Sequence, residues 1–449
     1  MKNYSIWQDI VNDNNYNELL NDISVDVLII GGGITGISTL YHLKDSKLNV
    51  LLVEQNKIGM STTSRSTGKL SYLQNDLIDK IRISCGDDEA INYVKAQIEA
   101  IKLLKNTIKG EKINCDLKEV NSKLYTNQDN EIKYLKGLTN FLSKCNIEVS
   151  ISNSNLVKSK YMIEVENTYL IHPMKFIVSL AKKLNNIHEN TSINKIIEKD
   201  NYYLCYTDKI KIKAKYVVIA SHYPYFNLPF VFPIKGTLEK SYLSASKYSG
   251  DNISLISYAS PFISIRSYKE YLLYLSNSHA INKNICDKKN FLELIKKIND
   301  LKLKPDYLWS NTDIMTNDGL PYIGEIKKNM LIGTGYNTWG LTNGFLAGKI
   351  ISDIILRRNN PYIDLFNPLR SNLEQIIGGV VSSYKSISGY INGIMKSKNK
   401  IKCSHMGCKL IYNEVENTYD CPCHGSRFNR NGEVIMAPAN KNINLSNKK

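Results

Sequence analysis

The pattern of apolar and polar residues along the 449-residue chain predicts a mixture of buried strands and amphipathic helices. An apolar run at 25–30 precedes a glycine-rich turn and a helix that begins near residue 34, and a second apolar run covers 49–53. Residues 74–146 are predicted to be helical, because apolar residues recur every three or four positions at 90–108 and 135–142. Strand-like runs separated by charged turns at 230–310 favour an antiparallel sheet.

Further strands and helices are predicted between and after these segments. A strand is expected around 193–197, a hairpin at 202–206 and 210–212, and a short buried strand at 216–220. A strand near 330 is followed by a predicted helix at 341–357. Residues 376–395 carry a helical apolar stripe interrupted by four glycines. A linker helix is favoured there over a helix on a membrane surface.

Length and composition indicate two or three soluble domains. The apolar fraction is 43%, and no uninterrupted apolar run of 18 residues suggests a transmembrane helix. The first ten residues lack the apolar core of a secretory signal, so a cytoplasmic location is expected. Five cysteines outside any motif are expected to be ordinary reduced thiols: Cys85, Cys115, Cys145, Cys205 and Cys286.

The net charge of +16 raises the question of a nucleic-acid partner. Lysines are spread along the whole chain, however, and no basic block is interleaved with aromatic residues. A nucleic-acid partner is therefore not expected. A positive surface would still favour anionic ligands such as a dinucleotide.

A dinucleotide site is predicted at the first strand–turn–helix unit. Gly31, Gly33 and Gly36 form G-x-G-x-x-G between the strand and the helix. Such glycines allow a tight turn and let the backbone approach a pyrophosphate at the helix N-terminus. Glu54, at the end of the second strand, is placed to accept hydrogen bonds from a ribose. The alternative is a tight turn without a ligand, and the motif alone does not separate FAD from NAD.

A second candidate site lies between Cys403 and Phe428. Cys403 and His405 are separated by one residue, and Cys421 and His424 by two. Two thiolates and two imidazoles are the ligand set of a Rieske [2Fe–2S] centre. A zinc site and a chance cluster are the alternatives, although Cys-x-His spacing is unusual for zinc.

The segments C-S-H-M-G-C and C-P-C-H-G-S resemble the two ligand boxes of the Rieske family. This resemblance implies Cys403, His405, Cys421 and His424 as ligands, a Cys408–Cys423 disulfide, and a place in the higher-potential branch. The strands that normally precede the first box are missing here. We therefore expect the ligand hairpins to pack against the FAD-binding domain or the 376–395 helix, and residues 401–449 expressed alone to fail to hold iron.

The segment G-M-S-T-T-S-R-S-T-G-K-L-S and residues 309–356 resemble the D-amino-acid-oxidase-like flavoproteins. This resemblance implies FAD, with the strand near Ile193 passing the adenine and Ala220 passing the pyrophosphate. The N-terminus of the 341–357 helix would face the flavin ring, where its positive end favours negative charge. The implied FAD-binding residues are Gly31, Gly33, Ile34, Thr35, Gly36, Glu54, Gln55, Ser64, Thr67, Ile193, Ala220, Gly333, Gly335, Gly340, Leu341 and Thr342.

The predicted fold class is α/β: a Rossmann-like FAD-binding domain with an interleaved α+β substrate domain, plus a small all-β Rieske domain. The oxidoreductase would span 1–366, a helical linker 367–400 and the Rieske domain 401–449. FAD-binding parts are expected at about 25–75, 160–228 and 310–358, and substrate-domain parts at about 76–159 and 229–309.

The implied activity is oxidation of a small amine or amino-acid-like substrate, with electrons passed to the chain's own cluster and then exchanged with an external partner. An electron-transfer or redox-sensing module without a substrate is the alternative, because no catalytic acid or base stands out in 230–310. Arg266 is either an anchor for a substrate carboxylate or a solvated residue at a strand edge.

Overall fold

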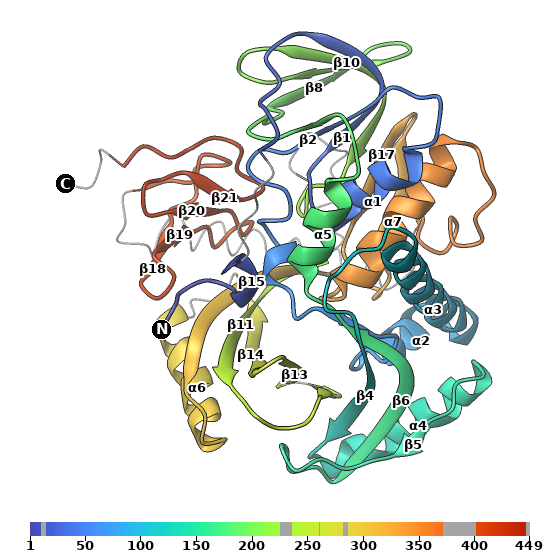
Figure 1. Ribbon diagram of the computed structural model, residues 1–449, viewed down its shortest axis with the longest axis vertical. Coiled ribbons are helices and arrows are strands. Elements are labelled where there is room, and N and C mark those ends of the chain that lie inside the picture. Colours follow the sequence, from blue (N-terminus) through green and yellow to red (C-terminus); the bar gives the residue numbers. More distant parts are fainter. Residues whose placement is uncertain (10–14, 225–235, 260, 282–285, 371–400, 446–449) are drawn as a thin grey trace.

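The computed structural model describes residues 1–449 apart from 10–14, 225–235, 260, 282–285, 371–400 and 446–449, and the described residues form three β-sheets (Figure 1). An eight-stranded sheet lies at the top of the view, a nine-stranded sheet lies below it, and a four-stranded sheet, drawn in red, lies beside them. Within the described part, no helix is both long and apolar enough to cross a membrane. The predicted helix at 376–395 falls outside the described residues.

The eight-stranded sheet is centred on β1 (Ile23–Ile30), which is parallel to both β2 (Val50–Val53) and β10 (Lys211–Ile219). All of β2 is buried, as expected of a parallel strand covered on both faces. Between β1 and β2 runs α1 (Ile34–Leu43), which packs along α7 (Gly340–Ile355). The predicted strand–turn–helix–strand unit is therefore confirmed. The other elements of this part are α5 (Pro173–Ala181), β7 (Ile187–His188), β8 (Lys195–Glu198), β9 (Tyr203–Tyr206), β16 (Tyr322–Lys327) and β17 (Met330–Thr334).

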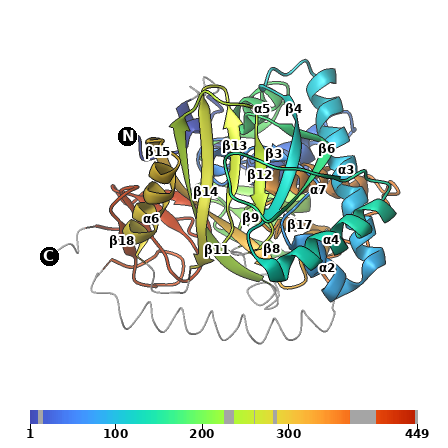
Figure 2. The same cartoon turned by 90° about the horizontal axis from the view of Figure 1, so that it is seen from below.

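The nine-stranded sheet has the order β15-β11-β14-β13-β12-β4-β6-β3, with β5 paired to β6. Helices α2, α3 and α4 gather at its β4–β6 end and α6 at its β11–β14 end (Figures 1 and 2). The elements are β3 (Lys69–Leu70), α2 (Leu77–Cys85), α3 (Asp87–Gly110), β4 (Lys118–Thr126), α4 (Asp129–Lys144), β5 (Ser150–Ile151), β6 (Tyr161–Leu170), β11 (Gly236–Lys247), β12 (Ser254–Ser257), β13 (Ser264–Tyr268), β14 (Tyr271–Ala280), α6 (Asp287–Asp300) and β15 (Pro305–Thr316).

Two details of this sheet differ from the sequence-based expectation. The stretch 74–146 is not helical throughout, because β4 lies within it and pairs with the distant strands β6 and β12. The strands β6 and β15 also hydrogen-bond within the nine-stranded sheet, although much of each falls in the predicted FAD-binding parts. Pairing partners far away in sequence decide both points.

The four-stranded sheet is an antiparallel meander of β18 (Ile411–Asn413), β19 (Thr418–Asp420), β20 (Arg427–Asn429) and β21 (Val434–Met436). All four strands follow the first cysteine–histidine box. Their small core consists of buried side chains such as Leu410, Phe428 and Val434. So small a core buries little apolar area, and the sheet depends on contact with the rest of the chain.

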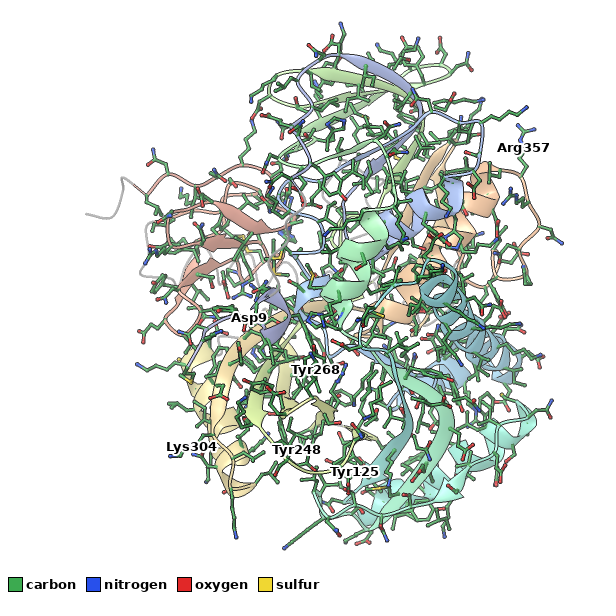
Figure 3. All side chains as sticks on the ribbon, in the orientation of Figure 1. Asp9, Tyr125, Tyr248, Tyr268, Lys304 and Arg357 are labelled. Atoms are coloured by element: carbon green, nitrogen blue, oxygen red, sulfur yellow. A yellow bond between two sulfur atoms is a disulfide. The ribbon has the colours of Figure 1, made fainter. Side chains whose placement is uncertain are left out.

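The N-terminal residues lie along β15 of the nine-stranded sheet and beside η2 (Thr63–Arg65). The short 3-10 turn η1 (Ile6–Asp9) lies near a second one, η2 (Thr63–Arg65). Asp9, labelled in Figure 3, accepts a hydrogen bond from the Tyr307 hydroxyl of β15 and pairs with Lys2. The start of the chain thereby covers the edge strand of the nine-stranded sheet.

A buried network of charges joins the four-stranded sheet to the nine-stranded sheet and to η2. Glu416 lies between Arg65 of η2 (2.9 Å) and Arg427 of β20 (2.7 Å). Arg427 also pairs with Asp420 at 3.0 Å. Lys240 of β11 completes the network by pairing with Asp420 (2.6 Å) and Asp287 (2.8 Å). Three cationic and three acidic side chains thus balance one another in a region shielded from water.

The balance of charge keeps these groups ionised despite their burial. Desolvation alone would raise the pKa of Glu416, but Arg427, Arg65 and Lys240 outweigh it and hold the pKa below its usual range. The four-stranded sheet therefore contacts the predicted FAD-binding part through Arg65, and it also contacts the predicted substrate-domain part through Lys240.

Removing one charge from this network should loosen the four-stranded sheet. Glu416→Gln leaves Arg65 and Arg427 without their shared carboxylate, and breaking a buried pair costs about 3 kcal/mol or more. We expect cluster absorbance to be lost at a clearly lower urea concentration than in the unmodified protein. The matched control is Glu414→Gln, since Glu414 pairs with Lys288 in an exposed position and its loss should leave the midpoint unchanged. Equal midpoints for the two variants would contradict the role given to the network.

Candidate functional site

The glycine-rich turn after β1 is shaped by close backbone contacts. Gly31 has a φ of +113°, and a Cβ there would lie 2.9 Å from the carbonyl of Ala220. A Cβ on Gly36 would lie 1.9 Å from the carbonyl oxygen of Gly31, which brings the helix against the turn. Gly33 differs, because its Cβ would meet only Thr63 Oγ1, at 3.5 Å. The space above Gly33 is open, as the approach of a pyrophosphate requires.

Glu54 lies at the end of β2, beside this turn. Its carboxylate accepts hydrogen bonds from the backbone N–H groups of Gly32 (2.7 Å) and Asn56 (2.9 Å). A carboxylate has about four acceptor positions, so acceptor capacity is left for a ribose hydroxyl. Desolvation raises the pKa of Glu54, and hydrogen-bond donors from a ligand would favour its ionised form.

One long cavity connects this turn with the nine-stranded sheet. Most of the residues predicted to bind FAD line it: Gly31, Gly33, Ile34, Thr35, Glu54, Gln55, Thr67, Ile193, Ala220, Gly333, Gly340 and Leu341. Four others lie behind the wall. Gly36 and Gly335 pack against neighbouring residues, Ser64 bonds to Met60 and Ser61, and Thr342 bonds to Gln97.

The N-terminus of α7 reaches the same cavity. Gly340 and Leu341 line it, and the N-cap residue Trp339 makes no side-chain cap hydrogen bond. The first N–H groups of a helix lack intrahelical partners and carry the positive end of the dipole. This end of the cavity therefore suits a group that accumulates negative charge.

Arg266 fits neither interpretation drawn from the sequence. It is only 2% exposed and does not line the cavity. Its guanidinium donates to the backbone carbonyls of Thr67, Gly68 and Ile171 at 2.7–2.9 Å. Burial lowers the pKa of Arg266 to about 9. The side chain braces the loop after η2 and is neither solvated nor placed to hold a substrate.

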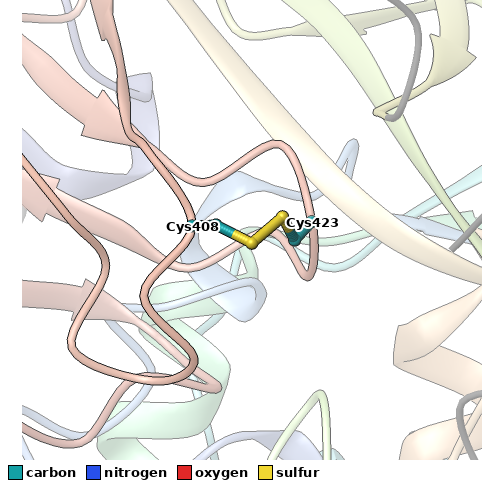
Figure 4. The surroundings of a disulfide bond; sticks show 2 residues. All are labelled: Cys408 and Cys423. Atoms are coloured by element: carbon teal, nitrogen blue, oxygen red, sulfur yellow. A yellow bond between two sulfur atoms is a disulfide. The ribbon is translucent and has the colours of Figure 1, made fainter. Parts of the chain in front are cut away.

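The second site is formed by two matching loops in the four-stranded module. The N–H of Gly407 donates to the carbonyl of Cys403 (2.9 Å), and the N–H of Gly425 donates to that of Cys421 (3.1 Å). Both glycines have φ values near +75°, specifically +74° and +76°. The Cys408–Cys423 disulfide joins the loops (Figure 4), as the Rieske resemblance implied.

The four predicted ligands converge between these loops. The rings of His405 and His424 lie 5.2 Å apart, and each Nδ1 atom is buried without a hydrogen-bond partner among the described residues. The buried thiols of Cys403 and Cys421 hydrogen-bond to each other, which lowers the pKa of Cys403 to about 7 and raises that of Cys421. Desolvation lowers the pKa of His424 to about 4, which leaves its imidazole neutral and able to bind a metal. The donor set fits a Rieske cluster.

Comparison with known proteins agrees with both sites. Residues 26–354 match the family model described as FAD dependent oxidoreductase, and residues 399–446 match the Rieske [2Fe-2S] domain. The chain belongs to the FAD-dependent oxidoreductase family. It carries a C-terminal Rieske domain, and its cofactors are FAD and a [2Fe–2S] cluster.

Individual relatives share these parts to different extents. The Bacillus subtilis (strain 168) protein YhfW, named as a Rieske 2Fe-2S iron-sulfur protein, is 25% identical over 97% of this chain and 96% of its own length. Gamma-glutamylputrescine oxidoreductase of Escherichia coli (strain K12) is 22% identical over 76% of this chain and 85% of its own. The structure of L-proline dehydrogenase from P. horikoshii has a TM-score of 0.64 at 16% identity, covering 78% of this chain and 98% of its own, which shows a shared fold.

In this FAD-dependent oxidoreductase the two sites are close neighbours. Ala437 of the Rieske domain lines the cavity. His222, which follows β10, lines it as well, and the ring of the next residue, Tyr223, lies 5.9 Å from the ring of His424. One peptide link thus separates a residue of the cavity wall from a residue beside a cluster ligand.

Several residues of the oxidoreductase site were not predicted from the sequence. They come from the nine-stranded sheet, from the segments around η2 and after β10, and from the Rieske domain: Arg65, Lys69, His222, Glu239, Ser241, Asn311, Asp313 and Ala437. His222 directly follows a predicted buried strand, and Asp313 lies in the segment that resembles a flavoprotein box. Their positions beside these predicted segments were the sequence signal that could have identified them as site residues.

Two glycines of the turn, Gly33 on the cavity side and Gly36 behind it, should respond differently to a methyl group. Gly36→Ala forces a Cβ into the Gly31 carbonyl, so we expect the FAD-free protein itself to unfold at a lower temperature. Gly33→Ala meets no such obstacle and should leave the FAD-free protein as stable as before, while reducing bound FAD because the methyl occupies the space for the phosphate. Thermal unfolding of FAD-free protein and the flavin content after reconstitution measure the two effects. Full FAD content in Gly33→Ala would contradict this placement of the pyrophosphate.

Proposed function

We propose that the protein oxidises a small amine or amino-acid-like substrate in the long cavity and passes the electrons through its own Rieske cluster to an external partner. Bound FAD supplies a two-electron acceptor that can release electrons singly, and the Rieske cluster supplies a one-electron carrier. The residues of the chain provide binding, orientation and a short connection between the two sites.

The observation that carries this proposal is the bridge formed by His222 and Tyr223. His222 lines the cavity, and Tyr223 lies against the ring of His424. Electron transfer slows steeply across empty gaps, so a continuous path of packed and bonded atoms favours it. Burial raises the pKa of Tyr223 to about 12, and its hydroxyl is therefore protonated at neutral pH.

The two ligand loops have different surroundings, which indicates a direction for electron transfer. Gly425, in the second loop, faces Thr312 and Leu238 of the nine-stranded sheet. The first loop carries Met406, whose side chain is 54% exposed, and a Cβ on Gly407 would meet no atom of the described residues within 4 Å. His424 is thus on the side of the flavin cavity, and the His405 loop is accessible to an external partner.

Removing the aromatic ring of Tyr223 should slow reduction of the cluster without preventing substrate oxidation. In Tyr223→Leu the aromatic contact with His424 is lost, and we expect reduction of the cluster to be slowed at least tenfold after anaerobic mixing with substrate. Tyr223→Phe keeps the ring and should behave as the unmodified protein does. Stopped-flow absorbance that follows the flavin and cluster bands separately gives both rates. Equal cluster rates in the leucine and phenylalanine variants would rule out the bridge.

Removing the cluster tests the relay itself. Cys421→Ser deletes one thiolate ligand, so the cluster should be lost while FAD stays bound. We expect substrate to bleach the flavin at the normal rate and reoxidation by a one-electron acceptor to be slow. Unchanged reoxidation would contradict the relay. Failure of every amine, amino acid and 2-hydroxy acid to bleach the flavin would instead favour a redox-sensing module without a substrate.

A further inference from the structure

Two paired strands of the nine-stranded sheet, β11 and β15, form one wall of the cavity. In the register of β11 and β15, Glu239 is opposite Asp313 and Ser241 is opposite Asn311. Alternate residues of a strand point to the same face, so these four side chains share one face of the sheet. All four line the cavity, as do the next alternate residues, Leu243 and Met315. The wall is therefore an ordered polar surface with one apolar residue at each end, Leu243 beyond Ser241 and Met315 beyond Asp313.

The polar groups of this wall are mainly hydrogen-bond acceptors. Asn311 donates its Nδ2 to the carboxylate of Asp313 at 3.0 Å, which fixes the orientation of the amide. Asn311 is only 5% exposed, and its Oδ1 is buried without a donor among the described residues. His222 bonds to the backbone of Thr312, and its Nε2 is likewise buried without a partner.

Unfilled acceptors of this kind indicate a ligand that brings donors. A buried acceptor without a donor is destabilising, and a bound N–H group would remove that penalty. Desolvation also raises the pKa of Asp313 to about 7, with Glu239 adding to the effect. A cation beside Asp313 would restore its ionised form.

The cationic side chains that line the same part of the cavity already have partners. The Nη1 of Arg65 is held by Glu416 and by the carbonyl of Ser310, whereas its Nε is buried without a partner among the described residues. Lys69 donates to the carbonyl of Leu255 (2.7 Å) and to Ser264 Oγ (2.9 Å), and desolvation lowers its pKa well below the usual range. A substrate carboxylate near this wall would thus meet the acidic side chains of Asp313 and Glu239, while the charge of Arg65 is already balanced by Glu416.

We propose that the substrate is an amine cation without a carboxylate on its reacting carbon, and that Asp313 and Asn311 bind its N–H groups. This inference rests on the proposed oxidation of an amine or amino-acid-like substrate and narrows it to one of the two classes. Oxidation at a C–N bond requires the nitrogen to be held in a fixed place, and the acceptor wall supplies that place. A carboxylate on the neighbouring carbon would be repelled by the same wall.

Matched probe pairs test this inference on the holoenzyme. L-Norvaline is n-butylamine with a carboxylate added to the carbon that bears nitrogen, and L-proline is related to pyrrolidine in the same way. Each probe is titrated anaerobically at pH 8 while the flavin spectrum is followed. We expect the two amines to give half-maximal change at concentrations at least tenfold lower than their carboxylated counterparts. A counterpart that binds equally well or better, or silence with all four probes, would overturn the proposal.

The form of the spectral change separates this inference from the proposed function. A shift of the oxidised flavin bands reports binding, and bleaching reports oxidation. Amines that shift the bands without bleaching them would support the binding site and contradict the oxidase activity. Bleaching by L-proline or L-norvaline at lower concentrations than by their amines would support the activity and contradict the amine site.

A variant links the effect to the wall. Asp313→Asn removes the charge but keeps the size, and we expect the half-maximal concentration of both amines to rise at least tenfold. Asp306→Asn is the matched control, because Asp306 lies on the same strand β15 outside the cavity and should change nothing. Flavin and cluster absorbance establish that both variants are assembled. Unchanged amine binding in Asp313→Asn would overturn the assignment.

Discussion

The charge network around Glu416 determines how the two halves of the molecule fit together. A buried ion pair adds little to stability by itself, because desolvation consumes most of the attraction. Its effect here is positional: Arg65 contacts Glu416 and also lines the cavity, so the Rieske domain and the flavin site share one side chain. Any shift of the domain would leave a charge unpaired in a region shielded from water. The position of Tyr223 beside His424 follows from this constraint.

The polarity of the cavity changes from one end to the other. The glycine turn and the start of α7 present N–H groups, which favour phosphates and a flavin that gains negative charge. The β11–β15 wall presents carboxylate and amide acceptors, and His222 adds an imidazole beside it. A dinucleotide and a cationic ligand would therefore occupy opposite ends without competing. The nine-stranded sheet, which contributes most to the acceptor end, sets this arrangement through the register of two strands.

Sequence alone predicted those parts of both sites whose residues lie close together in the sequence. The glycine turn, Glu54 and the two cysteine–histidine boxes are local motifs, and the structure brings each set together. Arg266 was misjudged because its partners, the carbonyls near residues 67 and 171, are distant in sequence. The β4 strand was missed for the same reason. Asn311 and Asp313 join Glu239 and Ser241 on one face of the sheet only through the pairing of β15 with β11. No local sequence pattern predicts that register.

Ala437 has a consequence for how the protein is made. The wall of the cavity includes this residue, which lies beyond position 400, whereas the rest of the wall is built from residues up to 341. Domains tend to fold as they leave the ribosome, so the oxidoreductase part emerges first with one side of its cavity still exposed. The cavity reaches its final shape only after the Rieske domain has been translated and docked. During biosynthesis, completion of the cavity wall thus depends on the domain that carries the cluster.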